Sequence, residues 1–249
     1  MTVAPTIAII PARYASHRFP GKVLADRTGK PLIQHVYERV RRAQLVERVI
    51  VATDDRRVFD AVEAFGGEAV MSRGEHANGT SRIAEVARDL DTPVIVNVQA
   101  DEPEIEPHLV DAAIRCLDEH PGCAVATLAS EFSDDEDPAD PNIVKVVMDT
   151  AGRALYFSRA LIPCDRDGDG GRPALKHLGL YVYRREFLLE FATLAPTPLE
   201  RTERLEQLRV LEHGHHIAVA IVTAEFHGID TPEQYDEFVK RRVARLTKR

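Results

Sequence analysis

The chain has 249 residues, of which 44% are hydrophobic and 29% charged, and its formal net charge is −8. This length suits one large α/β domain or two small ones, and the acidic balance argues against general binding to nucleic acid or to anionic membranes. Since no apolar run approaches the ~20 residues that span a bilayer and no secretory leader is recognisable, we expect a cytoplasmic protein.

The first part of the chain alternates short apolar runs, which predict strands, with apolar residues at helical spacing, which predict helices. In order, we expect a strand at Ile7–Ile10, a helix at Pro31–Arg42, a strand at Val46–Thr53, a helix from a cap at Asp54 or Asp55 to Phe65, a strand at Glu68–Met71, a helix at Ser81–Leu90 and a strand at Pro93–Val98. Alternation with short links is typical of a mostly parallel, doubly wound α/β sheet with helices on both faces.

The alternation breaks near residues 131–190, where we expect a smaller, irregular or antiparallel excursion that includes a dimer contact. Its expected strands, and the elements that follow, are strands at Ile143–Met148, Ala154–Phe157 and Leu175–Tyr183, helices at Glu186–Leu194 and Glu200–His213, a strand at Ile217–Val222 and a terminal helix from Pro232. We therefore expect a single domain over residues 1–249.

A basic loop follows the first expected strand. It carries Arg13, His17, Arg18 and Lys22 with no acidic residue, and Pro20-Gly21 predicts a turn just before the lysine. The carboxyl ends of strands in an α/β sheet are where such folds bind anionic ligands, so a triphosphate is the natural candidate. Neither a Walker A sequence nor GxGxxG occurs, and the alternative is a plain surface loop.

The stretch IPARYAS-x-R-x-PGK resembles the signature of sugar-activating nucleotidyltransferases, and more narrowly of the 3-deoxy-D-manno-octulosonate (Kdo) cytidylyltransferase family. The similarity extends from Ile7 to about Val239. It implies a Rossmann-like nucleotidyltransferase fold, a homodimer, CTP, Mg²⁺ and transfer of the nucleotidyl group with loss of pyrophosphate. It also implies that Ala12, Arg13 and Lys22 bind the nucleotide and that Arg13, Arg18 and Lys22 neutralise phosphate charge during catalysis.

Two carboxylates follow other expected strands. Asp101 comes just after the strand at Pro93–Val98, and Asp230 precedes the terminal helix. Carboxylates suit Mg²⁺, although either residue could simply cap a helix. The resemblance implies that both are metal ligands and that Asp101 is catalytic, with Ala100 where the family usually has glycine.

The segment HANGTSR begins at His76 and resembles the family's H-x-SGT-x-R, which contacts the base and ribose. This implies that Asn78, Gly79, Thr80 and Arg82 bind the nucleotide, with Asn78 where serine is usual. Taken alone, the segment predicts only a loop with a threonine helix cap.

The resemblance also implies an acceptor site. In isolation Tyr181 would be a core residue and Glu206 part of a solvated helix face, but both fall at positions where the family binds an acidic sugar. Arg159 would pair with its carboxylate, and Cys164 stands where relatives often have an aromatic residue. The full set of expected acceptor residues is Gln99, Ala100, Arg159, His177, Tyr181, Glu206 and Gln207.

Kdo is the favoured acceptor, since these side chains suit a keto-acid with many hydroxyls. The Ala100 methyl, Asn78 and Cys164 leave two other acids open, 8-amino-Kdo and the smaller phosphonoformate. A third alternative is a nucleotide-sensing module without activity, which the presence of Lys22 and both aspartates disfavours.

Overall fold

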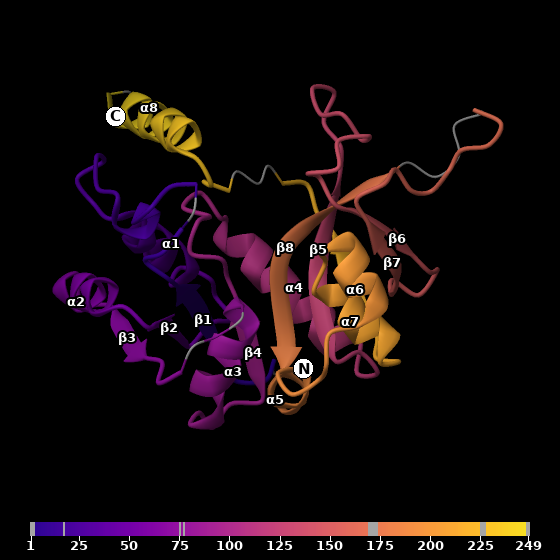
Figure 1. Ribbon diagram of the computed structural model, residues 1–249, viewed down its shortest axis with the longest axis horizontal. Helices are drawn as coiled ribbons and strands as arrows, with labels where there is room; N and C mark the ends of the chain where they lie inside the picture. The colour runs from indigo at the N-terminus through magenta and orange to yellow at the C-terminus, as the bar shows by residue number, and fades with distance from the viewer. Residues whose placement is uncertain are drawn as a thin grey trace.

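The computed structural model describes residues 3–16, 18–74, 76, 78–168, 174–224 and 228–247. Within these residues, nine strands form one sheet, which contains the path β3-β2-β1-β4-β8-β5-β9, with β6 and β7 off this path (Figure 1). The strands are β1 Thr6–Ala12, β2 Arg48–Thr53, β3 Glu68–Met71, β4 Val94–Asn97, β5 Val125–Glu131, β6 Lys145–Met148, β7 Ala154–Ser158, β8 Leu175–Arg184 and β9 Ile217–Ile221.

Most neighbouring strands on this path run parallel. The pairs β1–β2, β1–β4, β2–β3 and β5–β9 are parallel, whereas β8 lies antiparallel between β4 and β5. The strands β1, β2 and β4 are almost wholly apolar and buried, as expected for a sheet covered on both faces. The expectation of a mostly parallel α/β sheet is confirmed.

Helices cover both faces of the sheet. One face packs against α1 Leu32–Val40, α2 Arg56–Ala64 and α4 Pro107–Glu119. The other packs against α3 Gly79–Arg88, α5 Arg185–Phe191 and α7 Gln207–Glu212, with the short α6 Pro198–Glu203 beside α7. None of the helices in the described residues is long and apolar enough to cross a membrane.

Besides the two hydrophobic cores on the faces of the sheet, the protein has a smaller third core, which contains the last helix, α8 Pro232–Thr247. Its Tyr235 and Phe238 pack with Leu32 of α1 and with Ile229, and Phe19 of the basic loop lies 5.6 Å from the Tyr235 ring centroid. Figure 1 shows α8 lying near α1. The basic loop and the segment that precedes α8 are thus fixed against each other.

Two elements, α4 and β5, lie outside the expected set, and one expected helix is wrong in form. The helix expected at Glu200–His213 is two short helices, because Arg204 adopts φ +57° and ends α6. The side chain of Arg159 stabilises this break, since its Nε donates to the Glu203 carbonyl at 2.7 Å. Such a long-range contact leaves no trace in local periodicity.

The segment expected as an excursion is antiparallel but not wholly peripheral. Strands β6 and β7 pair antiparallel, and β6 joins the sheet through β8, yet β8 itself sits between β4 and β5. Lys145 of β6 is fully buried, and its Nζ donates to the carbonyls of Asp140, Ile143 and Arg159 at 2.6–2.9 Å. This ammonium therefore joins the loop before β6 to the end of β7.

We expect Lys145→Met to lower the free energy of unfolding by roughly 2–4 kcal/mol, because three carbonyls lose their donor in a buried place. Lys30→Met is the matched control, since its ion pair with Glu38 is half-exposed and should be worth less than ~1 kcal/mol. Urea unfolding of both variants measures the difference. Equal losses would contradict a structural role for the buried ammonium.

A histidine on β8 makes stability depend on pH. His177 of β8 lies edge-on to Phe157 at 5.0 Å between ring centroids, and its Nε2 is 2.9 Å from Thr127 Oγ1. Burial lowers the pKa of His177 from 6.5 to about 3. The unfolded chain therefore binds a proton that the folded protein excludes between these two pH values, and stability must fall as the pH drops below 6.5.

For this reason we expect His177→Gln to reduce the acid sensitivity of the fold. Between pH 7 and pH 5 the wild type should lose roughly 2 kcal/mol more unfolding free energy than the variant. Urea unfolding at the two pH values gives the comparison, and His35, whose pKa burial also lowers, contributes equally to both proteins. The same pH dependence in both would refute the burial of a neutral imidazole.

Candidate active site

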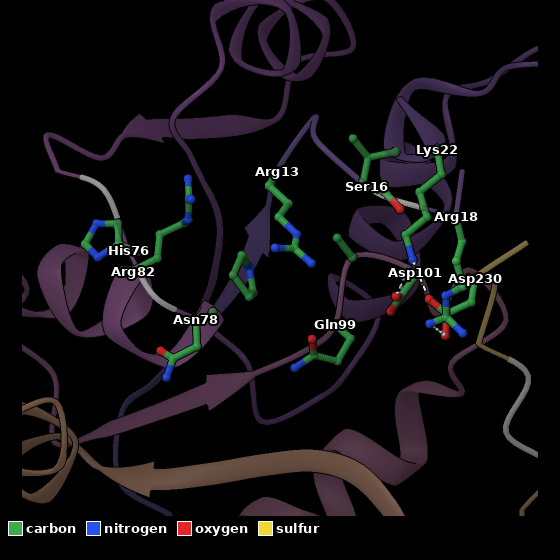
Figure 2. Close-up of a pocket in the computed structure, with 14 residues that line it drawn as sticks. Arg13, Ser16, Arg18, Lys22, His76, Asn78, Arg82, Gln99, Asp101 and Asp230 are labelled. Atoms are coloured by element: carbon green, nitrogen blue, oxygen red, sulfur yellow. Dashed lines mark hydrogen bonds and ion pairs between the residues drawn. The ribbon is translucent and has the colours of Figure 1, made fainter. Parts of the chain in front are cut away.

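A cavity of about 460 Å³ opens beside the ends of β1 and β4 (Figure 2). It brings together side chains from four distant parts of the chain: the basic loop, the start of α3, the segment around Asp101 and the segment around Asp230. The expected site residues that line it are Arg13, Arg18, Lys22, Asn78, Gly79, Arg82, Gln99, Ala100, Asp101 and Asp230. Ala12 is fully buried in β1 and does not line it.

The basic loop reaches the cavity through a fixed turn. Gly21 has φ +71°, and its amide donates to the Tyr14 carbonyl at 3.0 Å. A Cβ at Gly21 would lie 3.0 Å from the Tyr14 ring, so the turn before Lys22 requires glycine on two counts. Arg13 and Lys22 point into the same space in Figure 2, while His17 lies outside the described residues.

Lys22 is the centre of an ionic cluster. Its Nζ donates to Asp101 Oδ2 at 2.7 Å, to Asp230 Oδ1 at 3.0 Å and to the Ile229 carbonyl at 2.9 Å, and its side chain is only 11% exposed. Arg18 pairs with the other oxygen of Asp230 at 2.8 Å. Asp230 is therefore not a simple helix cap, since its carboxylate is bound to these two cations.

The two carboxylates fit a divalent cation. Both approach one ammonium, which here takes the position of a cation between them. Among the described residues, no group of three or more His, Cys, Asp or Glu could hold a metal. A divalent ion bound by Asp101 and Asp230 would thus take its remaining ligands from water and from phosphate oxygens, as Mg²⁺ commonly does.

Glu102 follows Asp101 in the chain. It is buried, its Oε2 has no hydrogen-bond partner among the described residues, and burial together with the charge of Asp101 raises its pKa well above the usual range. Its backbone holds the loop, donating to the Gln99 carbonyl and accepting from the Ile105 amide. The structure therefore places Glu102 under the loop that presents Asp101.

The start of α3 forms the opposite side of the cavity. Asn78 caps the helix, because its Oδ1 accepts from the Ser81 amide at 2.8 Å; the expected threonine cap is wrong. A Cβ at Gly79 would lie 3.2 Å from Pro11, so glycine allows α3 to approach β1 closely. Arg82 is nearly buried and donates to Asp54 at 2.7 Å, and this bond lowers the pKa of the Asp54 carboxyl.

A second cavity, of about 150 Å³, adjoins the first, and both are lined by Gly79 and Gln99. Besides these two, four further expected residues line this cavity: Thr80, Tyr181, Glu206 and Gln207. Glu206 is far from a solvated helix face, since its carboxylate accepts from Asn78 Nδ2 at 2.5 Å and from Thr80 Oγ1 at 2.6 Å. Burial raises the pKa of Glu206, and it also raises the pKa of Tyr181.

The sequence did not reveal Asn97 and Tyr183, which also line the second cavity. Asn97 lies opposite Tyr181 in the β4–β8 register, so the antiparallel pairing alone brings these residues together. The one local signal was the polar pair Asn97 and Gln99, which alternates at the end of an otherwise apolar strand.

Arg159 and His177 are not brought into this second cavity. Arg159 lines a separate cavity of about 900 Å³ together with Arg18 and Asp230, and its guanidinium donates to the carbonyls of Pro141 and Glu203. His177 packs between Phe157 and Tyr181, behind the Tyr181 ring that lines the second cavity. The acceptor residues expected from the sequence are therefore divided among four places, since Ala100 lines the first cavity.

A family model described as cytidylyltransferase matches residues 7–217. The chain is 53% identical over 244 residues to the 3-deoxy-manno-octulosonate cytidylyltransferase of Geobacter metallireducens, covering 94% of this chain and 96% of the relative. It is 49% identical over 242 residues to the enzyme of the same name from Solibacter usitatus, covering 97% and 94%.

Solved structures agree with these matches. A CMP:2-keto-3-deoxy-manno-octonic acid synthetase complexed with CTP superimposes with a TM-score of 0.92 at 42% identity, covering 97% of this chain and 100% of that one. The inositol-1-phosphate CTP transferase of T. maritima, at 14% identity and a TM-score of 0.67, shares the fold alone. Since the closer matches extend along nearly the whole of each chain, and the ionic cluster and paired cavities lie within them, this chain belongs to the 3-deoxy-manno-octulosonate cytidylyltransferase family.

Proposed function

We propose that this chain transfers a cytidylyl group from CTP to Kdo, giving CMP-Kdo and pyrophosphate. The observation that carries the proposal is the pair of adjoining cavities, one cationic and one lined by hydroxyl, amide and carboxyl groups. The first suits a triphosphate and the second suits an acceptor with several hydroxyls. Because Gly79 and Gln99 line both, a phosphate in one and a hydroxyl in the other can meet.

The reaction needs no covalent intermediate. An oxygen of the acceptor's anomeric hydroxyl forms a bond to the α-phosphorus of CTP, the bond from that phosphorus to the bridging oxygen breaks, and the hydroxyl proton is released with pyrophosphate. Negative charge grows on the departing pyrophosphate. Arg13, Arg18 and Lys22 supply positive charge at the cavity that would hold it, and binding both substrates side by side supplies the rest of the catalysis.

We further propose that Asp101 and Asp230 hold a Mg²⁺ ion. When bound, the ion would neutralise phosphate charge and favour departure of pyrophosphate. Support comes from the convergence of both carboxylates on the Lys22 ammonium and from the backbone bond of Ile229 N to the Asp101 carbonyl, which fixes the two segments together at 2.9 Å.

We expect Asp230→Asn to raise the Mg²⁺ concentration for half-maximal activity by at least tenfold, because a neutral amide is a poorer ligand than a carboxylate. Asp236→Asn is the matched control: it removes a carboxylate six residues along the chain, which pairs with Arg27 at the surface. Pyrophosphate release across a Mg²⁺ titration measures both. If Asp230→Asn gives the wild-type curve, the residue acts only as a partner of Lys22 and Arg18.

For the acceptor, the proposal assigns hydroxyl recognition to Gln99, Tyr181, Glu206 and Gln207, which line the second cavity or its border with the first. Ala100 lines the first cavity close to Gln99, so its methyl group stands near the place where the substrates meet. Arg159 and His177 are proposed acceptor residues on family resemblance alone. A carboxylate held by Arg159 would extend from the second cavity toward the one beside Asp230.

The proposal is tested by assaying pyrophosphate release from CTP with Kdo, 8-amino-Kdo and phosphonoformate side by side. We expect the highest specificity constant for Kdo, since an acceptor lacking the hydroxyls leaves buried polar groups unpaired. A higher constant for phosphonoformate would overturn Kdo as the acceptor, and Ala100→Gly should then recover some Kdo activity. Release with none of the three would favour a nucleotide-sensing module.

We also propose a homodimer formed through the segment 131–190. Two exposed apolar side chains support this proposal: Leu155 on β7 is 61% exposed, and Leu161 just beyond β7 is 49% exposed. Burying such side chains against a second copy would remove apolar surface from water.

A further inference from the structure

One side chain bridges the two cavities of the site. Asn78 lines the larger, nucleotide-side cavity, and Glu206 lines the smaller, acceptor-side cavity. Their side chains are joined by a hydrogen bond from Asn78 Nδ2 to Glu206 Oε1 at 2.5 Å, across 128 residues of sequence. The start of α3 and the turn before α7 are thus in direct contact at the border of the cavities.

The amide of Asn78 uses both of its ends. Its Oδ1 accepts from the Ser81 amide and so caps α3, while its Nδ2 donates to Glu206. A serine could cap the helix equally well but lacks a second polar atom at the far end of the side chain. Asparagine at this position therefore does something that capping does not require.

Glu206 depends on these contacts. Each of its two oxygens takes one donor from the start of α3, Oε1 from Asn78 and Oε2 from Thr80. The nearest guanidinium, of Arg209, is 3.7 Å from Oε1 and is already bound to Glu200. A carboxylate accepts about four hydrogen bonds, so Glu206 keeps acceptor capacity for a hydroxyl in the second cavity.

We propose that Asn78 is a positioning residue for the acceptor: it holds Glu206 in place from the cap of α3 and thereby couples the nucleotide cavity to the acceptor cavity. In this arrangement a shift of α3 on nucleotide binding also moves the Glu206 carboxylate, which binds the acceptor's hydroxyls. The inference rests on the proposed function for the identity of the acceptor, but the contact itself does not depend on that identity.

The test exchanges the amide and the carboxylate between positions 78 and 206. Asn78→Asp keeps the cap acceptor but places a carboxylate against Glu206, and we expect it to raise the KM for Kdo at least tenfold with kcat changed less than threefold. Glu206→Gln in the same chain restores an amide–carboxylate pair in the opposite direction. The double variant should recover to within about threefold of Glu206→Gln alone, whereas independent effects would multiply.

Ser81→Ala is the matched control, since Ser81 Oγ donates to the Asn78 carbonyl on the same turn and not to Glu206, and it should leave both KM values unchanged. Multiplying effects in the double variant, or an Asn78→Asp defect confined to the KM for CTP, would overturn the inference and leave Asn78 as a nucleotide contact. If the wild type prefers another acid, the KM values of the single and double variants are measured with that acid. A lack of activity with Kdo therefore does not decide whether Asn78 positions Glu206. Unfolding free energies of the wild type, Asn78→Asp, Glu206→Gln and the double variant measure the contact without any substrate. If the losses of the two single variants simply add in the double variant, the contact is also refuted.

Discussion

The site depends on one buried ammonium. Lys22 Nζ joins Asp101 at the end of β4 with Asp230 and the Ile229 carbonyl before α8, so a single group ties together three segments separated by up to 208 residues. Without it, two negatively charged carboxylates that approach the same point would repel each other. The same convergence that the ammonium stabilises is what makes the two carboxylates suitable for a divalent ion.

This ionic cluster is held in place by apolar packing. Asp230 precedes α8, and α8 is fixed by Tyr235 and Phe238 against Leu32, while Phe19 packs on Tyr235 from the loop that carries Lys22. The Tyr235 hydroxyl also accepts from the Arg27 amide at 2.9 Å. The charged groups and the small third core therefore position the same two segments, one by directional bonds and the other by buried area.

Local sequence signals were enough for the parallel half of the sheet and for most residues that line the first cavity. Apolar runs marked β1, β2 and β4, and parallel strands necessarily place Lys22 and Asp101 at one edge. The residues around the second cavity were harder to predict from the sequence, because their positions depend on pairing between distant segments. The place of β8 between β4 and β5, the left-handed Arg204 that separates α6 from α7, and the inward-facing Glu206 all depend on contacts that periodicity does not record.

The antiparallel strand β8 explains why the two cavities adjoin. The first cavity lies beside the carboxyl ends of β1 and β4, where open α/β sheets commonly bind ligands. Because β8 runs against β4, Tyr181 comes to lie opposite Asn97, and Tyr183 follows two residues on along the same face. A strand from a segment with irregular sequence signals thus supplies one wall of the second cavity, beside the first. The second cavity is therefore a consequence of strand direction, and the bond between Asn78 and Glu206 closes its border from the helix layer.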